Sequence, residues 1–490
     1  MKNIPQKIVG RKREQRLLKE LLNSQKAEFI AVYGRRRIGK TYLVRNLVAG
    51  TSSIFLHVTG LQGGSLQKQL SEFARQIGIT FYGGATIMPR QSWLDAFEDL
   101  TQAMNKLPAD RTITLFLDEL PWMATPKSKI LTAIELYWNR HWVFDNRIKL
   151  IICGSATSWI IEKVINNRGG LHNRVTRTIH LKPFSLFECG DFLREQGIKL
   201  DKRQTLALYT AFGGVPLYWS YIRKGLSAHQ IIDELCFQSD GPLAHEFKRL
   251  FKSLFNDPQP YELIIRKVAK YRYGISQSQL IKESGLADGG GTVRKFQELE
   301  ETGFIMSLIP YGRKERGIYY VIDDEYSLFY LRWIEPNLKS IAKKSKDKGF
   351  WLTQSNQPAW KAWRGIAFES ICYKHIDQIR IALGINQGAI AGTWRTFSKN
   401  LDPGAQVDLL FDRQDDAITL CEIKCSEEPF AIDKAYSQNL LQKIEIFKKE
   451  TKTTKQIFLA MVTTAGLKPT MYSEELVTNQ VTLTDLFKEG

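Results

Sequence analysis

The sequence predicts a multidomain α/β protein whose first part contains a parallel sheet covered by helices on both faces. The chain has 490 residues, of which 43% are hydrophobic and 24% are charged, so it is long enough for about three ordinary domains and too apolar to be disordered. In the first third, short apolar runs alternate with segments long enough for helices, which is typical of strands buried on both faces. These runs are 28–33, 53–58, 112–117 and 149–153.

The residues after the first apolar run match a phosphate-binding loop. Gly34-Arg35-Arg36-Arg37-Ile38-Gly39-Lys40-Thr41 fits the pattern G-x-x-x-x-G-K-[ST], between a strand pattern and a helical pattern. The backbone N–H groups of such a loop and the start of its helix bind nucleotide phosphates, the lysine reaches the terminal phosphates, and the Thr hydroxyl contacts Mg²⁺. We therefore expect all eight residues to lie at an ATP site, with Thr41 also at the metal.

Two later strand ends supply polar residues for the same site. The run 112–117 is followed by Asp118 and Glu119, and we expect Asp118 to contact Mg²⁺ and Glu119 to polarise the attacking water. The run 149–153 leads to Ser155, which either lies near the terminal phosphate or caps the next helix.

These motifs resemble the archaeal-type AAA+/STAND P-loop ATPases. The resemblance extends to Ile8-Val9-Gly10-Arg11, to the stretch 117–122, and to Asn173-Arg174 leading to 181–185. It implies an ATPase core over 1–182, and the segment 183–245, which has no comparable strand pattern, predicts a helical lid. It also implies that Arg174 reaches a nucleotide phosphate of its own or a neighbouring subunit, with Arg168 and Arg177 as rivals for that role.

The segment 246–335 predicts a winged helix-turn-helix. A capped helix ending at Gly285 is followed by a helix in which Val293, Phe296 and Leu299 share one face, and then by two strand-like pieces. Its outward residues suit DNA contact, although winged helices also serve as packing units between domains. The segment 336–358 is rich in lysine and predicts an exposed basic linker. The expected nucleic-acid contacts are Arg294 and Lys295 on the second helix and Arg313 and Lys314 in the wing.

The segment 359–490 contains a predicted hairpin with an unusual set of charges. The runs 406–411 and 419–425 flank a polar turn, and a turn centred on Asp415 places Asp408 opposite Glu422. Residues two apart share a face of a strand, so Lys424 projects beside Glu422. Two neighbouring carboxylates repel each other unless a cation lies between them, and Mg²⁺ or Mn²⁺ prefers such oxygen ligands.

This hairpin and the aromatic helix before it resemble the PD-(D/E)XK nuclease family, which has a restriction-endonuclease-like α/β fold. The helix contains Trp360, Trp363 and Ile376, and it provides Glu369 as a third carboxylate. The resemblance implies that Asp408, Glu422 and Glu369 hold the metal and that Lys424 activates water. A residue other than proline stands before the aspartate in this chain, and on the following helix Gln438 and Lys443 are further candidates for phosphate contact.

The charge distribution favours nucleic acid, with DNA as the main candidate, as the partner. The net charge is +18, of which residues 1–140 carry +10 and residues 351–490 carry −1. We expect a cytoplasmic protein that has no membrane partner, with a homo-oligomer as one option for its assembly, and its six cysteines fit no disulfide framework. The sequence thus predicts an ATPase that processes nucleic acid by ATP-gated, metal-dependent cleavage. Two alternatives remain open: a STAND-type signalling switch in which the nuclease fold is a docking unit, and a DNA-binding regulator acting through the winged helix.

Overall fold

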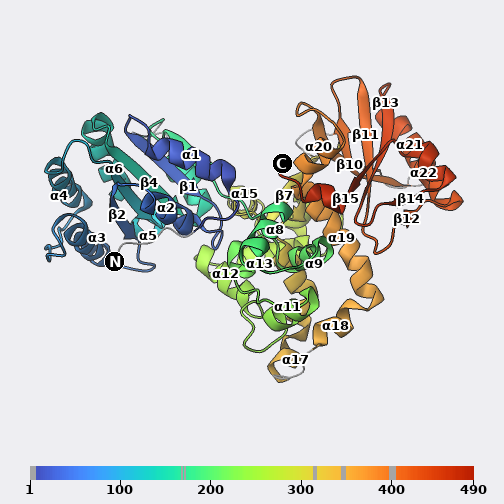
Figure 1. Cartoon of the computed structure of the whole chain (residues 1–490), viewed down its shortest axis with the longest axis horizontal. Helices are drawn as coiled ribbons and strands as arrows, with labels where there is room; N and C mark the ends of the chain where they lie inside the picture. Colours follow the sequence, from blue (N-terminus) through green and yellow to red (C-terminus); the bar gives the residue numbers. More distant parts are fainter. Residues whose placement is uncertain are drawn as a thin grey trace. The chain divides into compact units, whose positions relative to one another are not determined.

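A computed structural model of the chain describes residues 7–166, 169, 171, 173–312, 317–343, 349–396 and 404–490. The chain divides into two compact units, Met1–Pro183 and Phe184–Gly490 (Figure 1). Within the described residues, no helix has the length and the apolar character needed to cross a membrane.

In the described part of the first unit, five parallel strands form one sheet in the order β2-β3-β4-β1-β5. Strands β3 and β4 are buried along their whole length, which explains their continuous apolar sequences. The predicted parallel sheet is therefore confirmed, although no pattern had indicated its short fifth strand. The strands are β1 (Glu28–Tyr33), β2 (Ile54–Thr59), β3 (Ile113–Asp118), β4 (Ile148–Gly154) and β5 (Arg177–His180).

Helices pack on both faces of this sheet. Apolar side chains of α1 and α2 contact one face, and those of α3, α4 and α6 contact the other. Each face therefore has its own core, which is the arrangement that short crossover helices between parallel strands produce. The helical segments are α1 (Lys12–Leu22), α2 (Lys40–Ala49), α3 (Leu66–Phe81), α4 (Trp93–Asn105), α5 (Leu120–Met123), α6 (Ile130–Arg140), η1 (Trp142–Phe144), α7 (Thr157–Ile160) and η2 (Ile161–Ile165).

The second unit begins with helices only, over residues 184–254, all of which the structure describes. A glycine turn joins the second of these helices to the third. There Phe184 N–H donates to Gly214 O at 2.6 Å, and a Cβ at Gly214 would lie 1.9 Å from Phe184 O, so only glycine permits this close approach. The helices are α8 (Leu186–Glu195), α9 (Lys202–Phe212), α10 (Pro216–Trp219), α11 (Ala228–Cys236) and α12 (Glu246–Leu254).

The next segment combines three helices with a small antiparallel sheet of order β6-β8-β7. Ser276 caps the second helix by accepting a hydrogen bond from Gln279 N–H, and Gly285 ends it with a φ of 64°. The two expected strand pieces are confirmed, whereas the expected contacts at Arg313 and Lys314 lie outside the described residues. The elements are α13 (Gln259–Val268), β6 (Ile275–Ser276), α14 (Gln277–Ser284), α15 (Gly290–Glu301), β7 (Ile305–Leu308) and β8 (Tyr319–Ile322).

The segment expected to be an exposed linker is partly helical and packed. Trp351 is fully buried, and its backbone N–H donates to Asp233 Oδ1 at 2.8 Å. Its ring lies among those of Phe237, Phe329 and Trp360, so the expectation of exposure is wrong for Trp351. Ser355 is buried as well, whereas Leu352 and Thr353 are exposed. The elements here are α16 (Glu325–Phe329), η4 (Tyr330–Ile334), η5 (Glu335–Asn337), α17 (Leu338–Lys343) and α18 (Phe350–Ser355).

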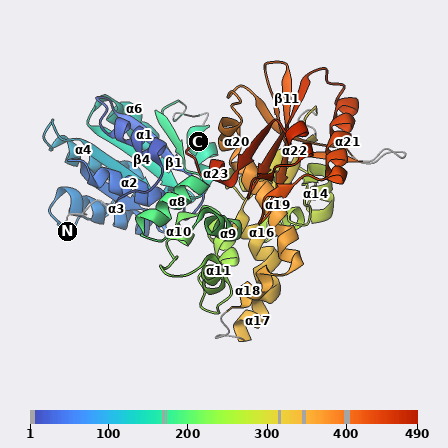
Figure 2. The same cartoon turned by 45° about the vertical axis from the view of Figure 1, so that its right-hand side comes forward.

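The C-terminal part is a mixed sheet of order β15-β13-β11-β10-β9 between two long helices. Helix α19 packs on one face and α21 on the other, and Figure 2 shows α21 along one side of the sheet. The helix expected to continue through Ile376 ends at Lys374, and a new helix follows the turn at His375. The elements are α19 (Pro358–Lys374), α20 (Ile376–Ala382), β9 (Ile390–Thr396), β10 (Ala405–Asp412), β11 (Ala417–Lys424), β12 (Phe430–Ala431), α21 (Lys434–Thr451), β13 (Gln456–Thr463), β14 (Leu467–Lys468), α22 (Met471–Leu476), β15 (Asn479–Thr482) and α23 (Leu483–Leu486).

Candidate functional site

The glycine-rich loop between β1 and α2 surrounds the side chain of Lys40. Gly34, Arg37 and Gly39 all have positive φ, which bends the backbone into a concave loop before the helix begins. Lys40 is 5% exposed, and its Nζ donates to Gly34 O at 2.8 Å and to Arg35 O at 2.9 Å. The ammonium group therefore lies inside the loop, where a phosphate could replace these carbonyl partners.

Asp118, at the end of β3, connects this loop to the neighbouring strands. Its Oδ2 accepts a hydrogen bond from Thr41 Oγ1 at 2.9 Å and lies 3.6 Å from His57 Nε2. Burial disfavours its charged form, but hydrogen bonds from His57 and Thr41 outweigh burial and hold the pKa of Asp118 below its usual value. The carboxylate is therefore ionised, as a magnesium ligand must be.

Glu119 is held by Ser155, which lies at the end of the adjacent strand β4. Glu119 Oε2 accepts from Ser155 N–H at 3.0 Å and from Ser155 Oγ at 2.9 Å. The residue that precedes helix α7 as its cap is Ala156, so the alternative that Ser155 caps this helix is wrong. The hydroxyl of Ser155 instead fixes the orientation of Glu119.

The remaining predicted nucleotide contacts are less closely associated with this cluster. Arg36 places its guanidinium 5.9 Å from the centre of the Trp122 ring, and Ile38 is buried with its carbonyl accepting from Arg11. Arg174 is exposed and makes no side-chain hydrogen bond or ion pair with the described residues. Its rival Arg177 is exposed on β5, and Arg168 lies outside the described residues.

A second cluster lies on β10 and β11 in the other unit. The register pairs Leu409 with Cys421 and Leu410 with Leu420, so Asp408 faces Glu422 as the turn position predicted. Asp408 is 7% exposed, with its Oδ2 accepting from Ile423 N–H at 3.0 Å and its Oδ1 accepting from Gln406 Nε2 at 3.3 Å. Burial and the adjacent charge of Glu422 raise the pKa of Asp408 well above its usual value.

Glu422 is bound by three side chains. Its Oε1 accepts from Tyr436 Oη at 2.7 Å and pairs with Lys424 Nζ at 2.9 Å, while its Oε2 pairs with Lys443. Burial disfavours its charge, yet the charges of Lys443 and Lys424 prevail and lower the pKa of Glu422. Glu422 is therefore an anion at neutral pH, and its pKa is shifted in the opposite direction from that of its neighbour Asp408.

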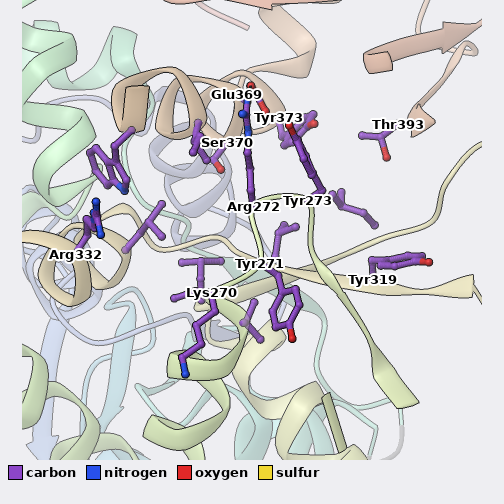
Figure 3. A pocket seen from close by; sticks show the side chains of 18 of the residues that line it. Lys270, Tyr271, Arg272, Tyr273, Tyr319, Arg332, Glu369, Ser370, Tyr373 and Thr393 are labelled. Atoms are coloured by element: carbon purple, nitrogen blue, oxygen red, sulfur yellow. Dashed lines mark hydrogen bonds and ion pairs between the residues drawn. The ribbon is translucent and has the colours of Figure 1, made fainter. Parts of the chain in front are cut away.

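Glu369 on α19 takes a different partner. Its Oε1 accepts from Arg272 Nη2 at 2.9 Å, and Figure 3 shows Arg272 extending to Glu369. Burial and the charge of Asp408 raise the pKa of Glu369. In the part of the chain that the structure describes, no three His, Cys, Asp or Glu side chains gather into a group that could hold a metal ion. Glu369 thus does not complete a three-carboxylate set with Asp408 and Glu422.

A pocket of about 220 Å³ opens beside these carboxylates. Asp408, Glu422 and Lys424 line it from the sheet, and Lys443 lines it from α21. The predicted candidate Gln438 is not among its lining residues, whereas Arg272 and Tyr273 are, although no sequence pattern had indicated them. The pocket can therefore admit water, a cation or a phosphate next to two carboxylates and two lysines.

Comparison with known proteins supports the first unit's assignment. A family model described as an ATPase domain predominantly from Archaea matches residues 8–222. This part of the chain is an archaeal-type ATPase domain. The match contains the whole cluster from the glycine-rich loop to Ser155, so the predicted parallel-sheet P-loop core is confirmed.

A similar protein matches more of this chain than the ATPase domain alone. The uncharacterized protein MJECL04 of Methanocaldococcus jannaschii is 25% identical over 378 residues, which cover 76% of this chain and 78% of that protein. Among solved structures, the Walker-type ATPase PABY2304 of Pyrococcus abyssi is 19% identical, with 66% of this chain and 96% of that chain covered and a TM-score of 0.48. The ORC2 protein of Aeropyrum pernix, in ADPNP and ADP complexes, is 18% identical, with 69% and 96% covered and a TM-score of 0.41.

Three contacts were not indicated by sequence patterns. His57 lies beside Asp118, Tyr436 donates to Glu422, and Arg272 pairs with Glu369. Each joins residues that are distant in sequence, the last pair being 97 residues apart. A search for polar residues at the ends of predicted strands could have found His57, because β2 is adjacent to β3 in the sheet.

Proposed function

We propose that this protein is an ATP-dependent enzyme that cleaves nucleic acid, with the phosphodiester cut beside Asp408 and Glu422. The observation that supports this most directly is the geometry of the hairpin. Two buried carboxylates face each other across β10 and β11, and Lys424 lies 2.9 Å from Glu422 at the wall of a pocket. A purely structural ion pair needs one carboxylate and one cation, and a second carboxylate that repels the first is not required.

The residues present fit a hard divalent cation. Mg²⁺ commonly takes one or two protein carboxylates and completes its shell with water and substrate phosphate oxygens. Asp408 and Glu422 would be these two ligands, and a cation would relieve the repulsion that raises the pKa of Asp408. Bound Mg²⁺ or Mn²⁺ would polarise the phosphate and acidify a water molecule.

The lysines of the chain would divide the remaining tasks. Lys424 projects into the pocket on the strand that carries Glu422, so it would orient the attacking water or stabilise charge on the phosphate. Lys443 approaches Glu422 from α21 and would keep this carboxylate ionised. In the ATPase domain, Thr41 and Asp118 would hold the magnesium of ATP. Glu119 would polarise the water that attacks the terminal phosphate of ATP.

The segment with α13, α14, α15 and the β6-β8-β7 sheet would be a winged helix-turn-helix. Two helices followed by an antiparallel strand pair support this interpretation. Arg294 is exposed but pairs with Glu298 at 3.1 Å, and Lys295 donates to Gly291 O at 3.3 Å. Both side chains remain candidates for DNA contact, because the side chain of Arg294 is 56% exposed and the hydrogen bond of Lys295 lies at the surface, where such contacts compete weakly with a phosphate.

Cleavage by the full chain tests the proposal. Single-stranded and duplex DNA and RNA are incubated with Mg²⁺ or Mn²⁺, with and without ATP, and the products are resolved on denaturing gels. Lys424→Ala is expected to slow cleavage by about 100- to 10,000-fold, the usual contribution of a positioned acid–base group. Lys434→Ala, an exposed lysine at the start of α21, is the matched control and should cut at the wild-type rate. Cleavage that survives Lys424→Ala would refute the assignment.

ATP gating needs a separate arm of the same assay. Lys40→Ala removes the ammonium group from the phosphate loop and leaves the hairpin unchanged. Under the proposal, this variant loses the ATP-dependent part of cleavage and retains metal binding. If Lys40→Ala cuts as fast as the wild type with ATP present, cleavage is independent of the ATPase domain.

A signalling switch is the second candidate, and one observation favours it. The carboxylates are already engaged within the chain, Glu422 by Lys424, Lys443 and Tyr436 and Glu369 by Arg272. Such a network suits a docking unit that has no metal. In that case no substrate is cut with either metal, whereas ATP still changes the protease sensitivity of the full chain.

A further inference from the structure

A large cavity in the second unit adjoins the carboxylate pocket. Its volume is about 900 Å³, near the upper end of the range of about 300–1,000 Å³ that holds organic ligands. It lies between the end of α13 and the chain after it, the start of β8, helix α19 and strand β9 (Figure 3). The two cavities share Arg272, Tyr273, Glu369 and Gln406 in their walls. A ligand in the large cavity would thus lie directly beside the carboxylates.

The described walls of the large cavity are strongly basic. Six of the described lining residues are cationic and only two are acidic, Glu335 and Glu369. Those two carboxylates already pair with Arg266 and Arg272. The cationic lining residues are Arg266, Lys267, Lys270, Arg272, Arg332 and Arg395.

Two of these cations are available to a ligand. Lys267 and Lys270 make no ion pair with any residue that the structure describes, although Glu283 attracts both electrostatically over a longer distance. They lie at the end of α13 and just beyond it, and Lys270 is exposed. A wall with this excess of positive charge selects an anion, and two lysines three residues apart suit neighbouring phosphates.

Aromatic rings are interleaved with these cations. Tyr273 is 42% exposed and lies in the shared wall, where the guanidinium of Arg272 covers its ring at 4.8 Å. Tyr271 and Tyr319 also line the cavity, and Arg395 lies 4.2 Å from the centre of the Tyr319 ring (Figure 3). An exposed ring backed by a guanidinium is a platform for a nucleobase. Bases inside a duplex are already stacked on both sides, so such a platform selects unpaired bases.

We propose that these two cavities form one track for an unpaired nucleic acid strand, in which Tyr273 stacks on a base and Lys267 and Lys270 hold the phosphates. The track leads the strand to Asp408 and Glu422, and in this respect the inference rests on the proposed cleavage. The occupant is therefore a strand end, a loop or an opened duplex.

Strand binding is measured on the full chain in EDTA, where no cleavage occurs. The probe is a fluorescein-labelled single strand of about 12 nucleotides, within the range of 4–16 that one binding unit occupies, and its duplex is the comparison. Anisotropy gives the affinity over a range of salt concentrations. The variants are Tyr273→Ala, Tyr273→Phe and the pair Lys267→Ala with Lys270→Ala. Lys202→Ala, an exposed lysine on α9 that lines neither cavity, is the control.

Each variant has a distinct expected result. Tyr273→Ala weakens single-strand binding by about 5- to 150-fold, whereas Tyr273→Phe preserves it because the ring alone stacks. Removing both lysines weakens binding and lowers the salt slope by about 1.4, which corresponds to two single-strand phosphate contacts. Lys202→Ala changes neither quantity.

Three outcomes overturn the track. These are unchanged affinity in both Tyr273→Ala and the double lysine variant, equal dependence of duplex binding on Tyr273, and displacement of the strand by mononucleotides at equal phosphate concentration. The last would assign the cavity to a free nucleotide. If the variants behave as expected but no metal supports cutting, strand binding stands and the proposed cleavage fails. If cutting proceeds but these residues do not affect binding, the proposed cleavage stands and the track fails.

Discussion

Acidification is expected to loosen the second unit through one buried imidazole. His375, between α19 and α20, is 1% exposed. Its Nε2 accepts a hydrogen bond from Leu186 N–H at 3.0 Å, and its Nδ1 lies 2.8 Å from Ile371 O, to which it donates. These two contacts fix the neutral tautomer, because a proton on Nε2 would face the N–H group of Leu186. Burial lowers the pKa of His375 to about 4.

The size and sign of the effect follow from this pKa. Between its ordinary value of 6.5 and about 4, the unfolded chain takes up a proton that the folded chain does not. The contribution of neutral His375 to the free energy of unfolding is therefore fully present above pH 6.5 and is lost as the pH falls towards 4. At 1.36 kcal/mol per pKa unit, the whole difference is about 3 kcal/mol, and about 2 kcal/mol of it is lost between pH 7.5 and pH 5.

Hydrogen exchange measures this loss locally, which matters because a chain with several domains does not unfold in two states. Peptides covering 184–190 and 371–379 should lose about 30-fold in protection between pH 7.5 and pH 5, after correction for the intrinsic exchange rate. His375→Gln keeps a donor and an acceptor but does not titrate, so its protection should not change in this way. Equal pH dependence in the wild type and in His375→Gln would refute the reasoning.

Three further predictions concern the ATPase domain and the glycine turn. Lys40→Ala should weaken ATP binding at least about 10-fold in calorimetry, since it removes a charged donor, and unchanged affinity would contradict the role of the loop. Glu119→Gln should bind ATP normally but hydrolyse it about 100- to 10,000-fold more slowly in a phosphate-release assay, and normal turnover would exclude it as the water-polarising group. Gly214→Ala should lower the local stability of the second unit by about 1–3 kcal/mol, measured by hydrogen exchange, because its Cβ meets Phe184 O. In contrast, Gly365→Ala, in α19 with open space around it, should raise the stability of that helix by about 0.5–1 kcal/mol. Equal effects of the two glycine changes would contradict the packing argument.

The core of the ATPase domain could be predicted because its signals are local. Strands β1, β3 and β4 are continuous apolar runs, and β1 begins and ends at the expected residues, Glu28 and Tyr33. The spacing of its glycines, lysine and threonine is enough to recognise the loop from Gly34 to Thr41. Asp118 could be predicted because it is the polar residue that ends the apolar strand β3. The hairpin register was equally accessible, because a central turn residue determines every pair in an antiparallel ladder.

Other elements had no comparable local signal. Strand β5 has four residues with one buried side chain, so its sequence has no apolar run, and it is held by pairing with β1. The buried Trp351 was missed because the lysines before it dominated the composition of the segment. The adjacent pair Phe350-Trp351 was a usable signal, since two large aromatic residues rarely occur together in an exposed connection.

Within the second unit, the cations proposed to bind the nucleic acid backbone and the carboxylates proposed to cleave it lie in different segments of the chain. Residues 351–490 have a net charge of −1, and Lys424 and Lys443 are already paired with Glu422. Lys267 and Lys270, which line the large cavity and make no ion pair with the described residues, belong to the segment that precedes α14. A fragment restricted to the C-terminal sheet would keep the carboxylates but lose these cations. Failure of such a fragment to bind nucleic acid would therefore say nothing against its carboxylate site, and only the full chain can test both functions together.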